Sequence, residues 1–379
     1  MTWLRAAHAT PFGRLEGSDP LSLMSEAATR VLAESGLERH DIDGLICGYA
    51  TTLPHLMLAT LFAETFGLSP RYAHGMQMGG ATGAGMIHLA RILVASGTCR
   101  NVLVVGGENR LTGQSRDTSV QTLAQVGHAR GEVPAGATIP AYYALAAARY
   151  LHDTGATQED LAALAVLMRA NAARTPGAQL TAPLSVADVM ASRPISEPLK
   201  LLDCCPISDG GAAVLVSAER GEGPAVRIAG AGQAHTHQHI SEAPDDLALG
   251  ARQSVARAYG EAGIGPDDVG YLAIYDSFTV TLAMLLEAVG LSAPGRAGRD
   301  GAAGRFDAGG ALPLNTHGGL LSYGHCGVAG AMAHVAEALT QMTGRAGARQ
   351  IAGQPAHGLV HGDGGVLSSH VSLVLERVS

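Results

Sequence analysis

The sequence is poor in charged and aromatic residues and contains a single lysine. Charged side chains make up 15% of the 379 residues, aromatic ones make up 4%, and Lys200 is the only lysine. A net charge of −8 without a basic run argues against nucleic acid as a partner. Gly, Arg or Glu interrupts every apolar stretch, so we expect no membrane span. An imine-forming mechanism would depend on Lys200 alone.

Metal-binding cysteine patterns and a secretory leader are also missing. The five cysteines, Cys47, Cys99, Cys204, Cys205 and Cys326, show no CxxC or histidine-rich spacing, so we expect free thiols and no metal. The opening residues, MTWLRAAHATPFG, lack the apolar core of a signal peptide, and we therefore expect a cytoplasmic protein. A hydrophobic content of 47% is typical of a compact enzyme rather than of a disordered chain.

Apolar periodicity predicts alternating helices and strands. Residues 21–36 and 55–67 have the spacing of amphipathic helices, whereas DIDGLICGYA and NVLVVGGEN have the character of buried strands. This alternation predicts a layered α/β fold. Residues 110–200 interrupt it with further helical patterns. We expect this stretch to be a helical excursion that covers one edge of the sheet and is suited to act as a substrate lid.

The second half of the chain repeats the plan of the first. MIHLARIL at 86–93 is echoed by MAHVAEAL at 332–339, and LVVGGEN at 103–109 is echoed by LVHGDGG at 359–365. Two matches in the same order indicate an internal duplication. We place the boundary in the turn at 221–224, which gives an N-terminal half of residues 1–222, including the excursion, and a C-terminal half of residues 223–379.

Several motifs along the chain resemble one family. They are DIDGL at 41–45, GGATGAG at 79–85, RPISEPLKLLDCCPISDGGAAVLVS at 193–217, YDSFTVTLAMLLEAVGL at 275–291, NTHGGLLSYGHCGVAG at 315–330 and HGDGGVLSSH at 361–370. Together they resemble the thiolase superfamily, in particular its sterol-carrier-protein-type (lipid-transfer) branch. The resemblance implies a duplicated thiolase fold with five layers, αβαβα, a homodimer or dimer of dimers, and coenzyme A thioesters as substrates.

The catalytic motifs depart from the family's pattern. The turn that normally carries the nucleophilic cysteine aligns with Gly80 in HGMQMGGATGAG, and the only nearby hydroxyl, Thr82, is better explained as a helix N-cap. The motif that usually begins with Asn or His reads Tyr275-Asp276-Ser277-Phe278. The Gly-His-Pro motif keeps His325 but continues with Cys326. The second family cysteine aligns with His361.

The polar residues at these positions suggest acid–base chemistry without an acyl-enzyme. The candidate catalytic residues are Tyr275, Tyr323, His325 and His361, since histidine and tyrosine both transfer protons. Gly80, Ser277 and Gly364 are candidates for the turn that holds the substrate and its oxyanion. Cys326 is a possible displaced nucleophile, because it follows a histidine; the alternative is a structural thiol packed beneath the turn.

This set fits a reaction through a thioester enolate, with retro-aldol cleavage preferred. The chain resembles the cysteine-less thiolase-like steroid side-chain aldolases, which implies that Tyr275 and Tyr323 form the acid–base pair and that a small OB-fold protein is a partner. It also implies a lyase of lipid or steroid metabolism with no cofactor beyond the coenzyme A of its substrate. Two alternatives remain: an acyltransferase that uses Cys326 or a non-covalent route, and a non-catalytic subunit that binds acyl-CoA or scaffolds a partner.

Overall fold

The computed structural model describes residues 1–378, and nine of its strands form one mixed sheet. Their order across the sheet is β3-β2-β4-β7-β1-β8-β11-β10-β9. The bounds are Trp3–Ala9 (β1), Gly44–Gly48 (β2), Tyr72–Met76 (β3), Asn101–Asn109 (β4), Asp209–Ser217 (β7), Ala225–His235 (β8), Tyr271–Ile274 (β9), His357–Gly364 (β10) and Ser369–Val378 (β11). A separate two-stranded sheet pairs Pro194–Ser196 (β5) with Leu199–Lys200 (β6).

Eleven α-helices and seven short turns of other helix types connect the strands of the described chain. The helices are Pro20–Ser35 (α1), Leu58–Phe66 (α2), Thr82–Ala95 (α3), Arg116–Ala124 (α4), Ile139–Thr154 (α5), Gln158–Ala172 (α6), Val186–Ala191 (α7), Leu249–Ala262 (α8), Thr279–Ala288 (α9), Ala297–Ala302 (α10) and Val328–Met342 (α11). The short turns are Arg39–Asp41, Val133–Ala135, Leu201–Asp203, Ile240–Glu242, Pro266–Asp268, Gly347–Arg349 and the π-turn Gly319–Tyr323.

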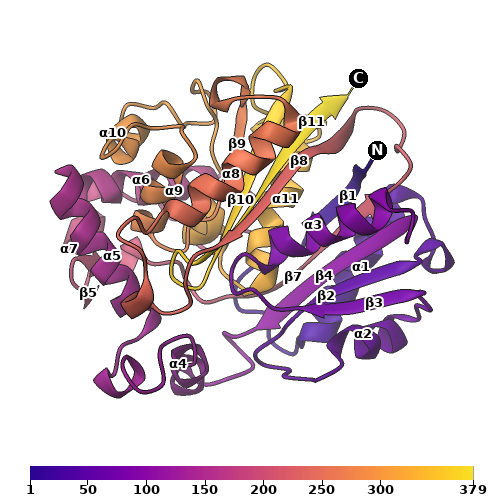
Figure 1. Cartoon of the computed structure of the whole chain (residues 1–379), viewed down its shortest axis with the longest axis horizontal. Helices are drawn as coiled ribbons and strands as arrows, with labels where there is room; N and C mark the ends of the chain where they lie inside the picture. The colour runs from indigo at the N-terminus through magenta and orange to yellow at the C-terminus, as the bar shows by residue number, and fades with distance from the viewer. Residues whose placement is uncertain (379) are drawn as a thin grey trace.

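The sheet consists of two equivalent halves, which confirms the duplication read from the sequence. In the first half β2 lies parallel to β4, and β4 is antiparallel to β7. In the second half β9 lies parallel to β10, and β10 is antiparallel to β11. The halves meet where β1 and β8 pair at Trp3–Arg227 and Leu4–Val226. Figure 1 shows the N-terminal half at the right and the C-terminal half at the upper left.

Three large hydrophobic cores lie between five layers of secondary structure, the central one on both sides of the α3 and α11 layer, as the αβαβα prediction requires. Strand residues alternate between faces, so Val104 packs in the central core with α3 and α11, while Leu103 packs in the outer core with α1 and α2. On the other side, α8 and α9 close the third core against β9, β10 and β11. The repeat pattern MIHLARIL/MAHVAEAL therefore marks the two central helices.

The helical excursion packs against the C-terminal half of the sheet. The buried faces of α5 and α6, including Tyr143 and Leu164, belong to the same core as α9. Figure 1 shows α5, α6 and α7 beside the C-terminal half, with α4 below the body of the molecule. The apolar faces of α5 and α6 find their partners on the second half because the first half's outer face is already covered by α1 and α2. That residues 110–200 act as a lid stays a prediction.

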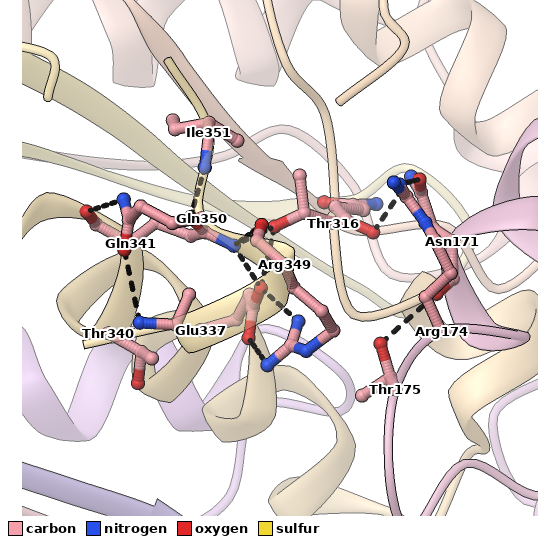
Figure 2. A network of polar contacts seen from close by, with 12 residues as sticks. Asn171, Arg174, Thr175, Thr316, Glu337, Thr340, Gln341, Arg349, Gln350 and Ile351 are labelled. Carbon is pink, nitrogen blue, oxygen red and sulfur yellow. Dashed lines mark hydrogen bonds and ion pairs between the residues drawn. The ribbon is translucent and has the colours of Figure 1, made fainter. Parts of the chain in front are cut away.

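A buried polar network fastens the loop that follows α10 and leads to the candidate site. Glu337 on α11 accepts hydrogen bonds from the two Nη atoms of Arg349, at 2.7 and 3.1 Å, and from the Thr316 hydroxyl at 2.6 Å. Asn171 on α6 donates to the carbonyl of Leu314 at 3.0 Å. Figure 2 shows these contacts, which hold residues 314–317 between α6 and α11. Among the residues described, no helix is both long and apolar enough to cross a membrane.

Candidate active site

The glycine-rich turn before α3 is closed by its own threonine. The Thr82 hydroxyl donates to the carbonyl of Gly79 at 2.6 Å and accepts the N–H of Met78 at 2.8 Å. The N-cap position is Ala81, so Thr82 is the first helical residue rather than the predicted N-cap. Because both hydrogen-bonding functions of its hydroxyl are engaged inside the turn, Thr82 is a structural residue.

At Gly80 the space of a side chain is occupied by Tyr275. A Cβ atom on Gly80 would lie 2.1 Å from the Tyr275 hydroxyl oxygen and 2.4 Å from the carbonyl oxygen of Asp363. Neither distance is compatible with a non-bonded contact. The phenol of Tyr275 therefore fills the position from which a cysteine at residue 80 would extend, and glycine is the residue that this packing permits.

Tyr275 is linked to His325 by a hydrogen bond of 2.9 Å between its hydroxyl and Nε2. The N–H of Gly327 donates to His325 Nδ1 at 3.2 Å, so Nδ1 carries a lone pair. Burial, with a contribution from Arg110, lowers the pKa of His325 to about 3, which leaves the imidazole neutral. In the neutral ring the proton must then be on Nε2, and His325 donates to the Tyr275 oxygen. The Tyr275 proton is thereby free to point into the site.

The side chains of Asn315 and Asp276 form hydrogen bonds that join the end of β9 to the loop that carries His325. Asn315 accepts the N–H of Ile274 at 2.9 Å and donates to its carbonyl at 2.7 Å. Asp276 accepts the N–H groups of Leu320 and Leu321 at 2.7 and 3.3 Å. These bonds flank Tyr275 in sequence, so they fix the distance between Tyr275 and the Gly319–Tyr323 turn. His325 comes just after this turn, so the same bonds also position its imidazole.

Gly364 and Ser277 complete the surroundings of the turn. A Cβ on Gly364 would lie 2.1 Å from the carbonyl oxygen of Met78, so the end of β10 is pressed against the glycine turn. Ser277 is 5% exposed, and its hydroxyl has no hydrogen-bond partner of normal geometry within residues 1–378. Nearby, the Tyr143 hydroxyl donates to the buried Asp363 carboxyl at 2.9 Å. The structure thus brings Gly80, Tyr275, His325 and Gly364 together, with Ser277 beside them.

The structure places Tyr323 in a different environment. Its hydroxyl donates to the carbonyl of Thr10 at 3.0 Å, and its ring packs edge-on against Phe12 with centroids 4.8 Å apart. It also lines a cavity of about 150 Å³ together with His317 and Glu337. Within residues 1–378 no hydrogen bond joins Tyr323 to Tyr275 or His325. Its pairing with Tyr275 as acid and base stays a prediction.

His361 also points away from Tyr275. Its Nδ1 bonds to the Ser372 hydroxyl at 2.8 Å and its Nε2 to His370 at 3.2 Å, while Gly362, the next residue, faces Ala81 in the turn. Successive strand residues face opposite sides of a sheet, so the His361 ring lies on the face of β10 opposite to Gly362, and a catalytic role for His361 stays a prediction. Burial lowers the pKa of His361 well below its usual value.

Cys326 has the properties of a structural thiol. It is 0% exposed, and its Sγ lies 3.0 Å from where a Cβ on Gly210 would be, next to the Phe12 ring. Burial raises its pKa well above the usual thiol value. A nucleophilic cysteine needs an accessible thiolate. The packing therefore favours the structural alternative over the displaced nucleophile.

Sequence reasoning missed Arg110, Asp363 and Cys205. Arg110 is 9% exposed and its positive charge opposes the rise in the pKa of Tyr275 that burial causes. Cys205 hydrogen-bonds through its N–H to the Ser277 carbonyl at 3.0 Å and adjoins Tyr275. A signal existed for the first two: Glu108-Asn109-Arg110 places charges at the end of a wholly apolar strand, and Asp363 is framed by glycines. Nothing in the sequence distinguished Cys205 from Cys204.

The arrangement can transfer a proton but offers no acyl-accepting nucleophile at residue 80. A neutral imidazole that donates to a phenol stabilises the phenolate, so Tyr275 can alternate between base and acid. The two glycine-rich turns pack directly against each other beside Tyr275, so backbone rather than side chains forms that wall of the site.

Comparison with known proteins finds similarity along almost the whole chain. Residues 4–220 match the family "Thiolase, N-terminal domain", and residues 232–377 match "Thiolase C-terminal domain-like". A steroid side-chain-cleaving aldolase of Thermomonospora curvata is 34% identical over 340 residues, which is 83% of each chain. An acetyl-CoA acetyltransferase of Methanothermobacter thermautotrophicus is 29% identical over 374 residues, which is 96% of each chain.

A solved structure extends the similarity to three dimensions. The structure described as "Ltp2-ChsH2(DUF35) aldolase" superposes with a TM-score of 0.86 at 31% identity, and the alignment covers 99% of this chain and 97% of the other. Because the alignment covers 99% of this chain, the two structures share both halves of the sheet.

Proposed function

This chain belongs to the thiolase superfamily, and from that premise we propose that it is a lyase which cleaves β-hydroxyacyl-CoA thioesters by a retro-aldol reaction. The single observation that carries the proposal is the Tyr275 hydroxyl in the space that a nucleophilic side chain at residue 80 would need. A tyrosine there moves protons and cannot hold an acyl group in the manner of a cysteine. The steroid side-chain-cleaving aldolase among the relatives supports the same reaction class.

The reaction begins with Tyr275 as the phenolate. The phenolate takes the proton of the substrate's β-hydroxyl, and the oxygen's electron pair forms the new carbonyl. The Cα–Cβ bond breaks, and its electron pair passes to Cα and the thioester oxygen as an enolate. The Tyr275 phenol then returns the proton to Cα. A carbonyl product and a shortened acyl-CoA leave, the phenolate is restored, and no electrons are gained or lost.

The residues around Tyr275 have distinct parts in this scheme. Burial raises the pKa of Tyr275, and the hydrogen bond from His325 Nε2 offsets that rise by stabilising the phenolate. The Gly80 turn, Gly364 and Ser277 form the surface against which the thioester lies. We propose no cofactor besides the coenzyme A of the substrate.

Acyl transfer is the second candidate function, because an acetyl-CoA acetyltransferase is also a relative. It would need a nucleophile that replaces the missing cysteine. The buried position of Cys326 and the closed hydrogen bonds of Thr82 do not favour either residue in that role. A non-catalytic acyl-CoA-binding subunit remains the third alternative, and the Tyr275–His325 pair has no purpose in it.

We further propose a homodimer and a small OB-fold partner. The edge strand β3 supports the dimer, because its residues Ala73, His74 and Gly75 are exposed. The segment that precedes this strand also exposes the large apolar side chains of Leu56 and Met57. The partner is proposed because the similar solved structure is described as a complex of Ltp2 with ChsH2(DUF35). The cytoplasmic location stays a prediction.

The test is a mass-spectrometric assay of the full chain, with and without candidate OB-fold partners, on a panel of β-hydroxyacyl-CoA thioesters. Formation of a carbonyl product and a shortened CoA ester without added thiol is the expected result. Tyr275→Phe should abolish turnover and leave thioester binding intact, which a scaffold subunit would not show. An acetyl adduct on Cys326 after incubation with acetyl-CoA would instead establish the transferase.

A further inference from the structure

Arg110 is a buried cation at the end of β4 whose charged group is fixed on one side only. Its Nε lies 3.2 Å from the Thr51 hydroxyl oxygen and 3.4 Å from Glu108 Oε2. Its Nη2 lies 3.5 Å from where a Cβ on Gly327 would be. Gly327 is the residue whose N–H binds His325 Nδ1, so the Nη edge lies beside the backbone that holds His325.

The carboxylate beside Arg110 is already saturated with other donors. Glu108 accepts the N–H groups of Thr51 and Thr52 at 2.8 and 2.9 Å and their hydroxyls at 3.0 and 2.6 Å. It therefore anchors the loop at residues 51–52 and needs no further donor from the guanidinium. A buried charge that is held in this way is preorganised, since its position does not depend on a ligand.

The Nη atoms of Arg110 have no hydrogen-bond partner of normal geometry among residues 1–378. The Tyr49 phenol lies beside the guanidinium, whose charge and loose hydrogen-bonding contact oppose the rise that burial imposes on the pKa of Tyr49. An arginine presents five N–H donors in a planar fork, and the Nη donors of Arg110, which are not sealed from solvent, are available to an acceptor that enters the site.

The surroundings contain no other unpaired charge that could serve as this acceptor. His325 is neutral because burial lowers its pKa to about 3, and burial raises the pKa of both Tyr275 and Asp363, which favours their neutral forms in the resting site. The nearby groups therefore leave the Nη edge facing a neutral region. Negative charge appears there with the Tyr275 phenolate that starts the reaction, and it passes to the thioester oxygen as the substrate reacts.

We propose that Arg110 is a further catalytic residue, whose Nη edge binds the thioester oxygen as negative charge develops on it in the enolate. This inference rests on the proposed retro-aldol function and adds an oxyanion-binding residue that acts at the same site. The oxygen of an intact thioester carries little charge, so the interaction strengthens as the Cα–Cβ bond breaks. Arg110 accordingly affects turnover more than substrate binding.

The experiment compares Arg110→Met and Arg110→Lys with the unaltered chain, and uses Arg91→Met as the matched control. Arg91 also pairs with a glutamate, Glu261, but lies near the C-terminal end of α3, away from the glycine turn. Two rates are measured: cleavage of a β-hydroxyacyl-CoA, and exchange of the α-protons of acetyl-CoA with deuterium from D2O. The exchange reports enolate formation alone and needs no aldol substrate. Thermal unfolding verifies that each variant is folded.

Arg110→Met should lower kcat and the exchange rate by about 10²- to 10³-fold, the range found for loss of one oxyanion donor, with KM changed by less than about threefold. Arg110→Lys should recover part of the loss, and Arg91→Met should behave as the parent. Rates that stay within threefold in a folded Arg110→Met variant would overturn the inference, as would an effect confined to KM. A parent chain that exchanges deuterium but cleaves no β-hydroxyacyl-CoA would refute the aldolase function while leaving Arg110 to be judged by exchange.

Discussion

The hydroxyl oxygen of Tyr275 lies 2.1 Å from the point that a Cβ on Gly80 would occupy. The two residues come from opposite halves of the chain, and neither is compatible with a larger partner. The absence of a side chain at residue 80 and the presence of a tyrosine at residue 275 therefore depend on each other. A site built for acyl transfer cannot be restored by replacing Gly80 alone.

Gly80→Ala tests this relationship. The new methyl group should displace the Tyr275 phenol, since the Asp363 carbonyl, 2.4 Å away, is backbone and cannot yield. We expect kcat/KM for cleavage to fall at least 10²-fold and the free energy of unfolding to fall by about 1–3 kcal/mol. Gly260→Ala is the control, because its Cβ would meet nothing within 4 Å. Full activity in Gly80→Ala would contradict the proposed role of Tyr275.

Between pH 5 and 10, kcat/KM for cleavage should rise with pH and should show no loss that is due to protonation of His325. Because the pKa of His325 is about 3, the imidazole stays neutral from pH 5 upward and imposes no acidic limb. Burial raises the pKa of Tyr275, so the phenolate fraction, and with it kcat/KM, should rise with pH up to the alkaline limit of stability. Initial rates from pH 5 to 10 test this. A profile that falls between pH 7 and 9 in a folded chain would argue against the phenolate.

Acid should destabilise the fold through its buried neutral histidines. Burial lowers the pKa of His317 and His361 well below 6.5 and that of His370 to about 4. Each binds a proton on unfolding at pH 5 but not in the folded state, so its contribution to stability is present above about pH 6.5 and is lost as pH falls. His361→Asn should reduce the slope of unfolding free energy between pH 6.5 and 5 by up to about 1.4 kcal/mol per pH unit. Urea titrations at several pH values measure it, with exposed His152→Asn as the control.

Cys326→Ala should retain full cleavage activity. The thiol is buried and packs near Phe12, so its loss should cost about 1 kcal/mol of unfolding free energy and leave the site unchanged. Thiol reagents applied to the native chain should react with the partly exposed Cys204 or Cys205 before Cys326. Peptide mapping identifies the labelled residue. Loss of turnover in a folded Cys326→Ala variant would favour the transferase alternative.

Ala73→Pro should convert the proposed homodimer to a monomer. The N–H of Tyr72 bonds inward to Asp43, so by strand alternation the N–H of Ala73 points out from the free edge of β3. Proline removes that donor without breaking the bonds to β2. Light scattering after size-exclusion chromatography gives the mass, and Ala73→Ser is the control. A parent chain that is monomeric at micromolar concentration would remove the proposed dimer.

The sequence by itself determined the layers and the chemistry that is missing. Apolar periodicity placed α1, β2, α2 and β4, and the two echoed motifs identified the central helices, because burial of one face imposes a fixed spacing on the chain. The absence of cysteine at Gly80 and the presence of His325 were also readable, since both follow from residue identity alone.

Only the tertiary structure decided which polar side chains meet. Alternation along β10 places the ring of His361 on the face opposite to Gly362, where it bonds to Ser372 and His370, and nothing in its local sequence states which face that is. Asn315 and Asp276 bring His325 to Tyr275 through contacts between residues 41 to 45 positions apart in the chain. Arg110 lies beside the backbone that holds His325, while Glu108, which Thr51 and Thr52 saturate, fixes one side of its guanidinium. Side-chain direction depends on such long-range packing, which residue identity and spacing do not encode.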